Sequence, residues 1–224
     1  DLMASNLGPL IILAPLLLGI ATGLVGAQRW DLALKFINGV SFGEVDPIFD
    51  HDYAFYLFSF PFLNFVKNVL WEAWVLIAIG VGMISFFKRT LYLDRTGLVF
   101  LPQARGTFSI LACLAFLLFA GNFYFARFEM LMEGNTVVNG ISYAEANGRV
   151  PVLNITIFLA LIGAVGSLLN LFWPNFRRLF IVGAVVGVFY IGGSFYPNLL
   201  QKFIVAPNEL VKEAPYIEYS IEAT

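Results

Sequence analysis

Five long apolar runs set the pattern of the chain. They are Leu7–Ala27, Val69–Phe87, Thr107–Ala126, Pro151–Phe172 and Leu179–Leu200. A helix crosses a hydrocarbon core with about 20 mostly apolar residues, which each run supplies. Because the runs are apolar around the whole helix, they do not fit helices lying flat on a membrane. The pattern predicts an all-α protein, a polytopic transmembrane helix bundle with interfacial helices.

The polar stretches between the first two runs predict structure at the membrane surface. In "QRWDLALKFING", Trp30, Leu34 and Ile37 fall on one helical face flanked by charged residues, as an interfacial helix requires. Farther on, Asp52 can cap a helix that begins at Tyr53, where its charge suits the helix dipole. An aromatic girdle at headgroup level follows, with Pro61 bending the chain into the next span: Tyr53, Phe55, Tyr56, Phe58 and Phe60.

The order of these segments predicts four regions. Residues 1–27 form the first transmembrane span, and 28–61 an outer interfacial segment. Residues 62–200 hold four spans with short cytoplasmic loops and one longer outer loop (127–150). Residues 201–224 begin an extracytoplasmic soluble domain.

Positive charge predicts the orientation. The loop between the second and third spans carries Lys88, Arg89, Arg95 and Arg105 against one acid, and the next loop on the same side carries Arg177 and Arg178. Cytoplasmic loops are enriched in Lys and Arg. We therefore expect a multi-pass protein of the cell (plasma) membrane with Asp1 on the cytoplasmic side and Thr224 on the extracytoplasmic side.

Composition supports a lipid-facing exterior. Of the 224 residues, 59% are hydrophobic and 12% charged, about half the charged fraction of a soluble domain. The lipid bilayer is therefore an expected partner. The net charge of −2 argues against nucleic acid, which requires clustered Lys and Arg. A single cysteine, Cys113, provides neither a disulfide nor a pair of metal ligands.

Small residues spaced by four predict where helices pack closely, because helices in lipid associate mainly through close contact of their backbones. Such pairs occur in the first, fourth and fifth runs. They are Gly19 and Gly23, Gly163 and Ser167, and Gly183 and Gly187.

The polar residues offer little catalytic chemistry. Three aspartates surround His51 in "DPIFDHD", but a metal site would need more than one soft ligand or a repeated carboxylate spacing, so we expect no metal and no cofactor. Glu72 lies between Trp71 and Trp74, which are typical of a membrane interface, and is interpreted as a surface carboxylate at the outer face. Arg127 and Glu129 mark the outer end of the third span, and their spacing of two gives each a different partner.

The outer loop before the fourth span carries three local signals. Asn139-Gly140 favours a hairpin turn, and Ser142-x-x-Glu145 is typical of a capping box that opens a short helix. Gly148 is expected to end that helix. Pro151 then suits the first turn of the fourth span.

The tail changes to a soluble composition after the fifth span. Leu210, Ala214, Ile217 and Ile221 recur at helical spacing, and Pro215 would kink this helix or start a second one. The stripe is too short to fold alone and needs a surface to dock on. We therefore expect the protein's own extracytoplasmic domain as a partner that the present chain lacks.

The quoted segments also resemble a known family. "RWDLALKFINGVSFGEVDPIF", "FYLFSFPF", "ARFEML" and "APNELVKEAPYIEYSIEAT" are similar to the bacterial membrane proteins of uncharacterised protein family 0182, from about Arg29 to Thr224. The resemblance implies seven spans followed by a large extracytoplasmic domain, so this chain would lack two upstream spans and most of the soluble part. It implies no activity. The candidate interfacial or outer-face residues are Trp30, Asp46, Asp52, Tyr56, Glu72, Arg127, Glu129, Arg149, Asn208 and Glu209.

Three functions remain open. The leading hypothesis is a non-enzymatic module that anchors and orients an extracytoplasmic domain, with other membrane subunits as further partners, because the polar residues gather at the outer interface and in the tail. A transporter or channel component is the second, although it would usually show polar groups at mid-membrane. The third is a membrane enzyme with most of its active site in the extracytoplasmic domain that this chain is expected to lack; the catalytic residues are unknown.

Overall fold

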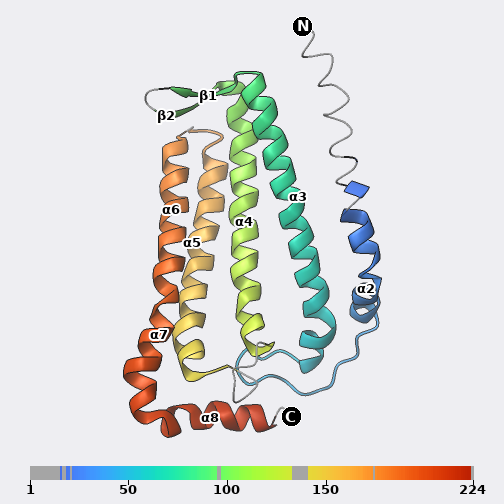
Figure 1. Ribbon diagram of the computed structural model, residues 1–224, viewed down its shortest axis with the longest axis vertical. Helices are drawn as coiled ribbons and strands as arrows, with labels where there is room; N and C mark the ends of the chain where they lie inside the picture. Colours follow the sequence, from blue (N-terminus) through green and yellow to red (C-terminus); the bar gives the residue numbers. More distant parts are fainter. Residues whose placement is uncertain are drawn as a thin grey trace. The chain divides into compact units, whose positions relative to one another are not determined.

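The computed structural model describes residues 16, 19–20, 22–94, 97–132, 141–173 and 175–222 (Figure 1). The chain divides into two compact units. The first comprises residues 1–45 and 51–76, and the second comprises residues 46–50 and 77–224. The helix α3 (Phe60–Phe87) contributes to both units.

The first unit contains the amphipathic helix that the sequence predicts. Helix α2 (Trp30–Ile37) exposes its apolar residues Trp30 and Ile37, while Lys35 pairs with Asp31 one turn away at 3.1 Å. The ring of Phe36 stacks on that of Phe62 at 4.8 Å, which holds α2 against the start of α3. An exposed apolar face beside charged residues is the composition of a helix that lies in a membrane interface.

The long helix that ends in α3 begins where the sequence places its cap. Helical residues start at Tyr53, and Asp52 Oδ1 accepts the Ala54 amide at 2.7 Å. A π-helical turn, η1 (Phe55–Ser59), then leads directly into α3. Because Pro61 has no N–H and its ring crowds the carbonyl four residues back, a widened turn ahead of it lets the helix continue without interruption.

The second unit is built on three long helices that lie side by side in Figure 1. They are α4 (Pro102–Met132), α5 (Val150–Leu169) and α6 (Phe176–Ser194). Residues buried along α5 recur every three or four positions, the spacing of one helix face. The core they enclose is apolar: Cys113, Phe116, Phe123, Met130, Ile141, Leu153, Ala164 and Val186.

The loop before α4 folds into a β-hairpin, which the sequence analysis did not predict. Strands β1 (Leu91–Asp94) and β2 (Gly97–Phe100) pair antiparallel, with Leu91 opposite Phe100. The Phe100 ring stacks on that of Phe176 at 4.0 Å and fixes the hairpin beside the start of α6.

A buried polar contact ties the same end of the unit together. Asn170, directly after α5, donates its side-chain amide to Ser109 Oγ of α4 at 2.8 Å. Its side-chain oxygen accepts the backbone N–H of Asn175 at 2.5 Å, just before α6. The Asn170 side chain therefore links α4, α5 and the start of α6. Both its amide nitrogen and its amide oxygen have a hydrogen-bond partner within the protein.

Four helices are long and apolar enough to cross a membrane, among the residues that the structure describes. They cover Phe55–Phe87, Pro102–Met132, Glu145–Leu169 and Phe176–Glu218, so the second to fifth predicted spans are confirmed as helices. The observed helices are longer than the predicted runs at one end or both; one such extension is the aromatic segment 55–68, which is helical and continuous with α3. Most of the first predicted span lies outside the described residues, although 22–27 are helical.

The segment before α5 confirms the capping box and corrects the expected helix end. Ser142 Oγ accepts the Glu145 amide at 3.3 Å, and Glu145 Oε2 accepts the Ser142 amide at 3.0 Å. The helix does not stop at Gly148, because the π-helical turn η2 (Glu145–Arg149) runs into α5. A Cβ at Gly148 would lie 2.8 Å from Leu200 Cδ1, so this glycine permits a close approach. The predicted Asn139-Gly140 turn lies outside the described residues.

Beyond α6 the chain continues in short helical pieces and then turns into α8 (Glu209–Glu222). The pieces are α7 (Tyr196–Leu200), the π-helix η3 (Gln201–Val205) and the 3₁₀-helix η4 (Ala206–Asn208). Pro215 lies inside α8, so it starts no second helix. Figure 1 shows α8 crossing the end of α5 and α7 that lies opposite the hairpin.

Candidate functional site

A cavity of about 820 Å³ lies beneath α8 in the second unit. Its walls come from the segment 141–153, from α6 and α7, and from α8 itself. This volume falls within the range of about 300–1,000 Å³ that is typical of ligand sites. The cavity is the candidate functional site among the described residues.

Two hydrogen bonds fasten α8 over the cavity. The Tyr143 backbone N–H donates to Glu213 Oε2 at 3.0 Å, and Asn147 Nδ2 donates to the Tyr216 hydroxyl at 2.9 Å. Lys212 Nζ also lies 5.0 Å from the centre of the Tyr143 ring, a cation–π geometry. These contacts use one face of α8, the face that carries Lys212, Glu213 and Tyr216.

The opposite face of α8 is exposed. Val211 is 75% exposed, and Ala214 is also exposed. Two residues of the predicted apolar stripe, Leu210 and Ile217, line the cavity instead, although Leu210 is 88% exposed. Glu213 and Tyr216 find hydrogen-bond partners in the bundle and thereby orient the helix.

The charged lining of the cavity is mainly acidic. It contains the carboxylates of Glu145, Glu209 and Glu213 and the guanidinium of Arg149. Glu145 is fixed by the capping box with Ser142. The second carboxylate oxygen of Glu213, Oε1, is buried and has no hydrogen-bond partner among the described residues. A buried carboxylate oxygen without a hydrogen-bond donor is energetically unfavourable, so Glu213 Oε1 is the atom of the site that most needs a donor.

Close helix packing shapes the floor of the cavity. A Cβ at Gly148 would lie 3.2 Å from the Pro197 Cα, and a Cβ at Gly193 would overlap the Val152 side chain. Gly148 and Gly193 thus let α5, α6 and α7 meet below α8, which closes the cavity on the side of the bundle.

Among the predicted site residues, Arg149 and Glu209 come together in this cavity, although 60 positions separate them in the sequence. Asn208 ends the 3₁₀-helix η4 just before Glu209 and is exposed. The remaining candidates lie elsewhere. Trp30, Asp52, Tyr56 and Glu72 belong to the first unit.

Asp46 organises a turn. Its side chain is buried, and Oδ2 accepts the Phe49 amide at 2.6 Å while its carbonyl accepts the Asp50 amide at 2.9 Å. Asp50 has a positive φ of 62°, a conformation that Asp tolerates better than most residues. The turn places the Phe49 ring edge-on to Phe128 of α4 at 5.3 Å.

The Asp52 carboxylate accepts hydrogen bonds from several backbone amides of the first unit. Besides capping Ala54, its carboxylate accepts the Ser41 hydroxyl and the amides of Phe42 and Gly43. The hydrogen bond from Ser41, followed by that from Ala54, lowers the pKa of Asp52 from 3.8 to about 2. Within the described ranges, no three side chains of His, Cys, Asp and Glu lie close enough to hold a metal ion.

Three further candidates lie on α3 and α4. Arg127 Nη1 donates to Asn154 Oδ1 of α5 at 2.8 Å, and its guanidinium lies 4.4 Å from the centre of the Tyr124 ring. Glu129, two residues later, is half-buried. Glu72 is exposed on α3, next to the edge-on pair of Trp71 and Trp74.

The predicted packing residues differ in their surroundings. A Cβ at Gly163 would lie 2.6 Å from Phe116 Cδ1, and Ser167, one turn later, is fully buried with its hydroxyl donating to the Gly163 carbonyl. A Cβ at Gly183 would make an ordinary contact with Phe116 at 3.8 Å. The positions Gly19, Gly23 and Gly187 have no such neighbour within 4 Å in the described structure.

Sequence reasoning gave Glu213, Asn170 and Lys67 no role as site residues. Glu213 lies in a charged tail where nothing distinguishes it from its neighbours. Lys67 is 9% exposed and lies inside the helix Phe55–Phe87. An ionisable residue inside a span is a recognised signal, but the predicted span began at Val69 and left Lys67 outside.

Comparison with known proteins identifies the kind of chain this is. The family model described as uncharacterised protein family UPF0182 matches residues 1–224. A UPF0182 protein of Geobacter sulfurreducens is 38% identical over 230 residues, covering 100% of this chain and 25% of the relative. A UPF0182 protein of Geobacter sp. strain M21 is 35% identical over 220 residues, covering 96% and 24%.

A more distant relative gives the same picture. A UPF0182 protein of Frankia alni is 33% identical over 207 residues, covering 92% of this chain and 20% of the relative. The chain thus spans about a quarter or less of the length of these relatives. No solved structure matches it.

Proposed function

The chain belongs to the uncharacterised protein family UPF0182, and we propose that in such a protein it is the membrane-embedded module that anchors and orients an extracytoplasmic domain. The module would consist of the spanning helices, the interfacial segment around α2 and the helix α8. The relatives, about four times as long, have ample polypeptide for such a domain. Other membrane subunits are further partners of this module.

The arrangement of α8 is the observation that carries the proposal. One face is hydrogen-bonded to the bundle through Glu213 and Tyr216, whereas Val211 and Ala214 on another face are exposed. A helix that is fixed on one side and apolar on the other is suited to hold a second structure in a defined direction. The occupant of the exposed face would be the remainder of the same polypeptide.

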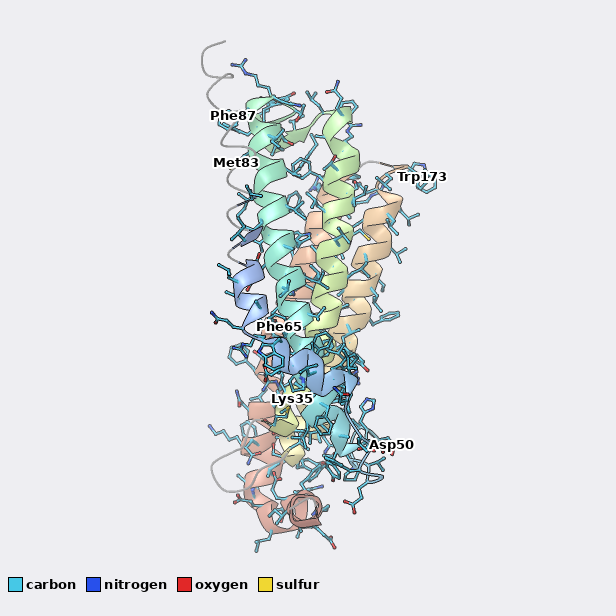
Figure 2. The ribbon with its side chains drawn as sticks, turned by 90° about the vertical axis from the view of Figure 1, so that its right-hand side faces the viewer. Lys35, Asp50, Phe65, Met83, Phe87 and Trp173 are labelled. Carbon is cyan, nitrogen blue, oxygen red and sulfur yellow. The ribbon has the colours of Figure 1, made fainter. Side chains whose placement is uncertain are left out.

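The charge pattern supports an orientation with α8 outside the cell. Lys88, Arg89 and Arg105 flank the hairpin, and Arg177 and Arg178 open α6. Figure 1 places the hairpin and the start of α6 at the end opposite α8, and Figure 2 shows Phe87 and Trp173 at that same end. Basic residues concentrate on the cytoplasmic side of membrane proteins.

Cysteine labelling in whole cells tests the orientation. We expect Val211→Cys to react with a membrane-impermeant maleimide added outside, and Trp173→Cys to react only after permeabilisation. Both side chains are exposed, so burial does not confound the comparison, and the native Cys113 is buried. Labelling of Trp173→Cys in intact cells would show that the protein has the opposite orientation.

Charge on the exposed face of α8 tests the anchoring role. In the full-length protein, Val211→Asp with Ala214→Asp places two carboxylates in the contact with the domain. We expect proteases added outside to release that domain faster, while Gln103→Glu, exposed at the start of α4, leaves the cleavage rate unchanged. Equal rates in all three proteins would contradict the proposal.

One observation favours the alternative of a transporter component. Lys67 is buried within the candidate span Phe55–Phe87, and ionisable residues at such positions often mark ion pathways. If the purified protein carried ion or solute flux in liposomes and Lys67→Met abolished that flux, the protein would be a transporter component and the anchoring proposal would be wrong.

A further inference from the structure

The cavity beneath α8 has the chemistry of a binding site for a zwitterion. We infer that it binds a head group that carries a primary ammonium next to a phosphate, as in phosphatidylethanolamine. Three carboxylates and one guanidinium line a space of about 820 Å³, so both signs of charge meet one partly open cavity. This inference is independent of the anchoring role, since α8 could hold a domain with the cavity empty.

Glu213 supplies the reason for an ammonium. Its Oε2 already accepts the Tyr143 amide, while the buried Oε1 lacks a donor among the described residues. Lys212, the adjacent cation of α8, is directed to the Tyr143 ring and is not part of the lining. An ammonium group with three N–H donors would balance the excess of negative charge that Glu145, Glu209 and Glu213 bring to the lining.

Arg149 supplies the reason for an attached anion. Its guanidinium lines the cavity and makes no hydrogen bond or ion pair with any residue that the structure describes. Glu145, four residues earlier, is held by Ser142 through Oε2 and forms no ion pair with Arg149 in the described structure. A guanidinium binds phosphate oxygens through two parallel hydrogen bonds, which favours a phosphate over a hydroxyl at this position.

The remaining walls favour a lipid as the source of the head group. Val152, Leu153 and Ile217 give the cavity an apolar side, and Tyr190 adds an aromatic ring. Val152 and Leu153 belong to the first turn of α5, within the candidate span Glu145–Leu169. Farther along this span, the exposed side chains of Ile155 and Phe158 offer acyl chains an apolar surface while the head group remains under α8.

Lipid retention by the full-length protein tests the inference. The purified protein is delipidated in detergent, offered equal amounts of phosphatidylethanolamine, phosphatidylcholine and phosphatidylglycerol, and examined by native mass spectrometry. We expect phosphatidylethanolamine to be retained about tenfold more strongly than either competitor, because one lacks N–H donors on its cation and the other lacks a cation. Equal retention of the three lipids would overturn the inference.

Two variants and one control locate the binding. Glu213→Gln and Arg149→Gln should each lower phosphatidylethanolamine retention about tenfold, the loss of one charge-assisted contact. Glu218→Gln, an exposed position on α8 outside the cavity, should leave it unchanged. Because Arg149 is exposed, its variant folds even if Glu213→Gln does not, and unchanged retention in Arg149→Gln would overturn the inference.

Soluble phosphoethanolamine distinguishes the two sources of the same chemistry. If it displaces the lipid at millimolar concentration, the head group alone carries recognition and a soluble zwitterion is an equivalent ligand. If it does not, the acyl chains are required and the ligand is the lipid. Displacement by inorganic phosphate alone, without the ammonium, would contradict the role of Glu213.

Discussion

The Tyr143 backbone N–H donates a hydrogen bond to Glu213 Oε2 at 3.0 Å, across 70 positions of sequence. The contact joins the entrance of α5 to the terminal helix α8 and closes one side of the cavity. It also explains why Val211 and Ala214 of α8 face outward, since the helix is oriented by the carboxylate that reaches this amide.

The second attachment of α8 gives a prediction about stability. Tyr216→Phe removes the hydroxyl that accepts Asn147 Nδ2 and should weaken the docking of α8 by about 0.5–1.5 kcal/mol. Hydrogen exchange of the α8 amides should accelerate while exchange in α4 stays constant. Tyr196→Phe, at an exposed tyrosine of α7, is the control and should change neither.

Close packing between α4 and α5 predicts a difference between two neighbouring glycines. Gly163→Ala places a Cβ 2.6 Å from Phe116 Cδ1 and should cost about 1–3 kcal/mol through overpacking, which would lower the Tm in detergent. Gly166→Ala, on the same helix, has open space at the Cβ and should be neutral or stabilising. Equal Tm values for the two variants would show that the helices separate easily there.

The buried amide of Asn170 is expected to matter more than an exposed one. Asn170→Ala leaves the Ser109 hydroxyl and the Asn175 N–H without their partner, a loss of about 1–3 kcal/mol for each unsatisfied buried group. Asn68→Ala, at an exposed position of α3, is the matched control and should leave the thermal unfolding curve unchanged. A Tm for Asn170→Ala equal to that of the wild type would mean that water replaces these contacts.

The lowered pKa of Asp52 predicts that the turn held by its carboxylate is sensitive to acid. Its pKa is lowered to about 2 in the folded state from 3.8, so its contribution is full above the unfolded value and is lost as the pH falls through about 2. The Ala54 and Gly43 amide resonances should therefore shift between pH 4 and about 2. In Asp52→Asn this titration should disappear.

Ser41→Ala isolates the largest cause of that shift. Without the Ser41 hydroxyl, the pKa of Asp52 should move back toward 3.8, and the resonances should titrate at higher pH. A titration midpoint unchanged from the wild type would assign the lowered pKa to the backbone amides instead.

Much of the architecture could be predicted because apolar length is a local property. A run such as Thr107–Ala126 predicts a spanning helix without knowledge of any other segment, and α4 is a helix long and apolar enough to cross a membrane. The caps at Asp52 and Ser142 are equally local, since each bond spans two or three residues. The sequence analysis did not predict the hairpin after α3, because the segment carries few of the residues that favour turns. The position of the hairpin also depends on the stacking of Phe100 on Phe176.

The cavity could not be predicted, because it depends on distances between segments far apart in the sequence. Gly148 reads as a helix end, yet its role is to admit Leu200, a residue of another helix. Arg149 could be named as an outer-face candidate, but its place beside Glu213 in one cavity is decided only when α8 is placed over α5.

The sequence by itself determined which apolar runs form long helices, since hydrogen bonding within a helix and transfer of side chains to lipid depend on neighbouring residues alone. Only the tertiary structure decided which face of α8 turns inward and which carboxylate is buried beneath it. That choice follows from pairing hydrogen-bond donors and acceptors across the bundle end, as between Asn147 and Tyr216.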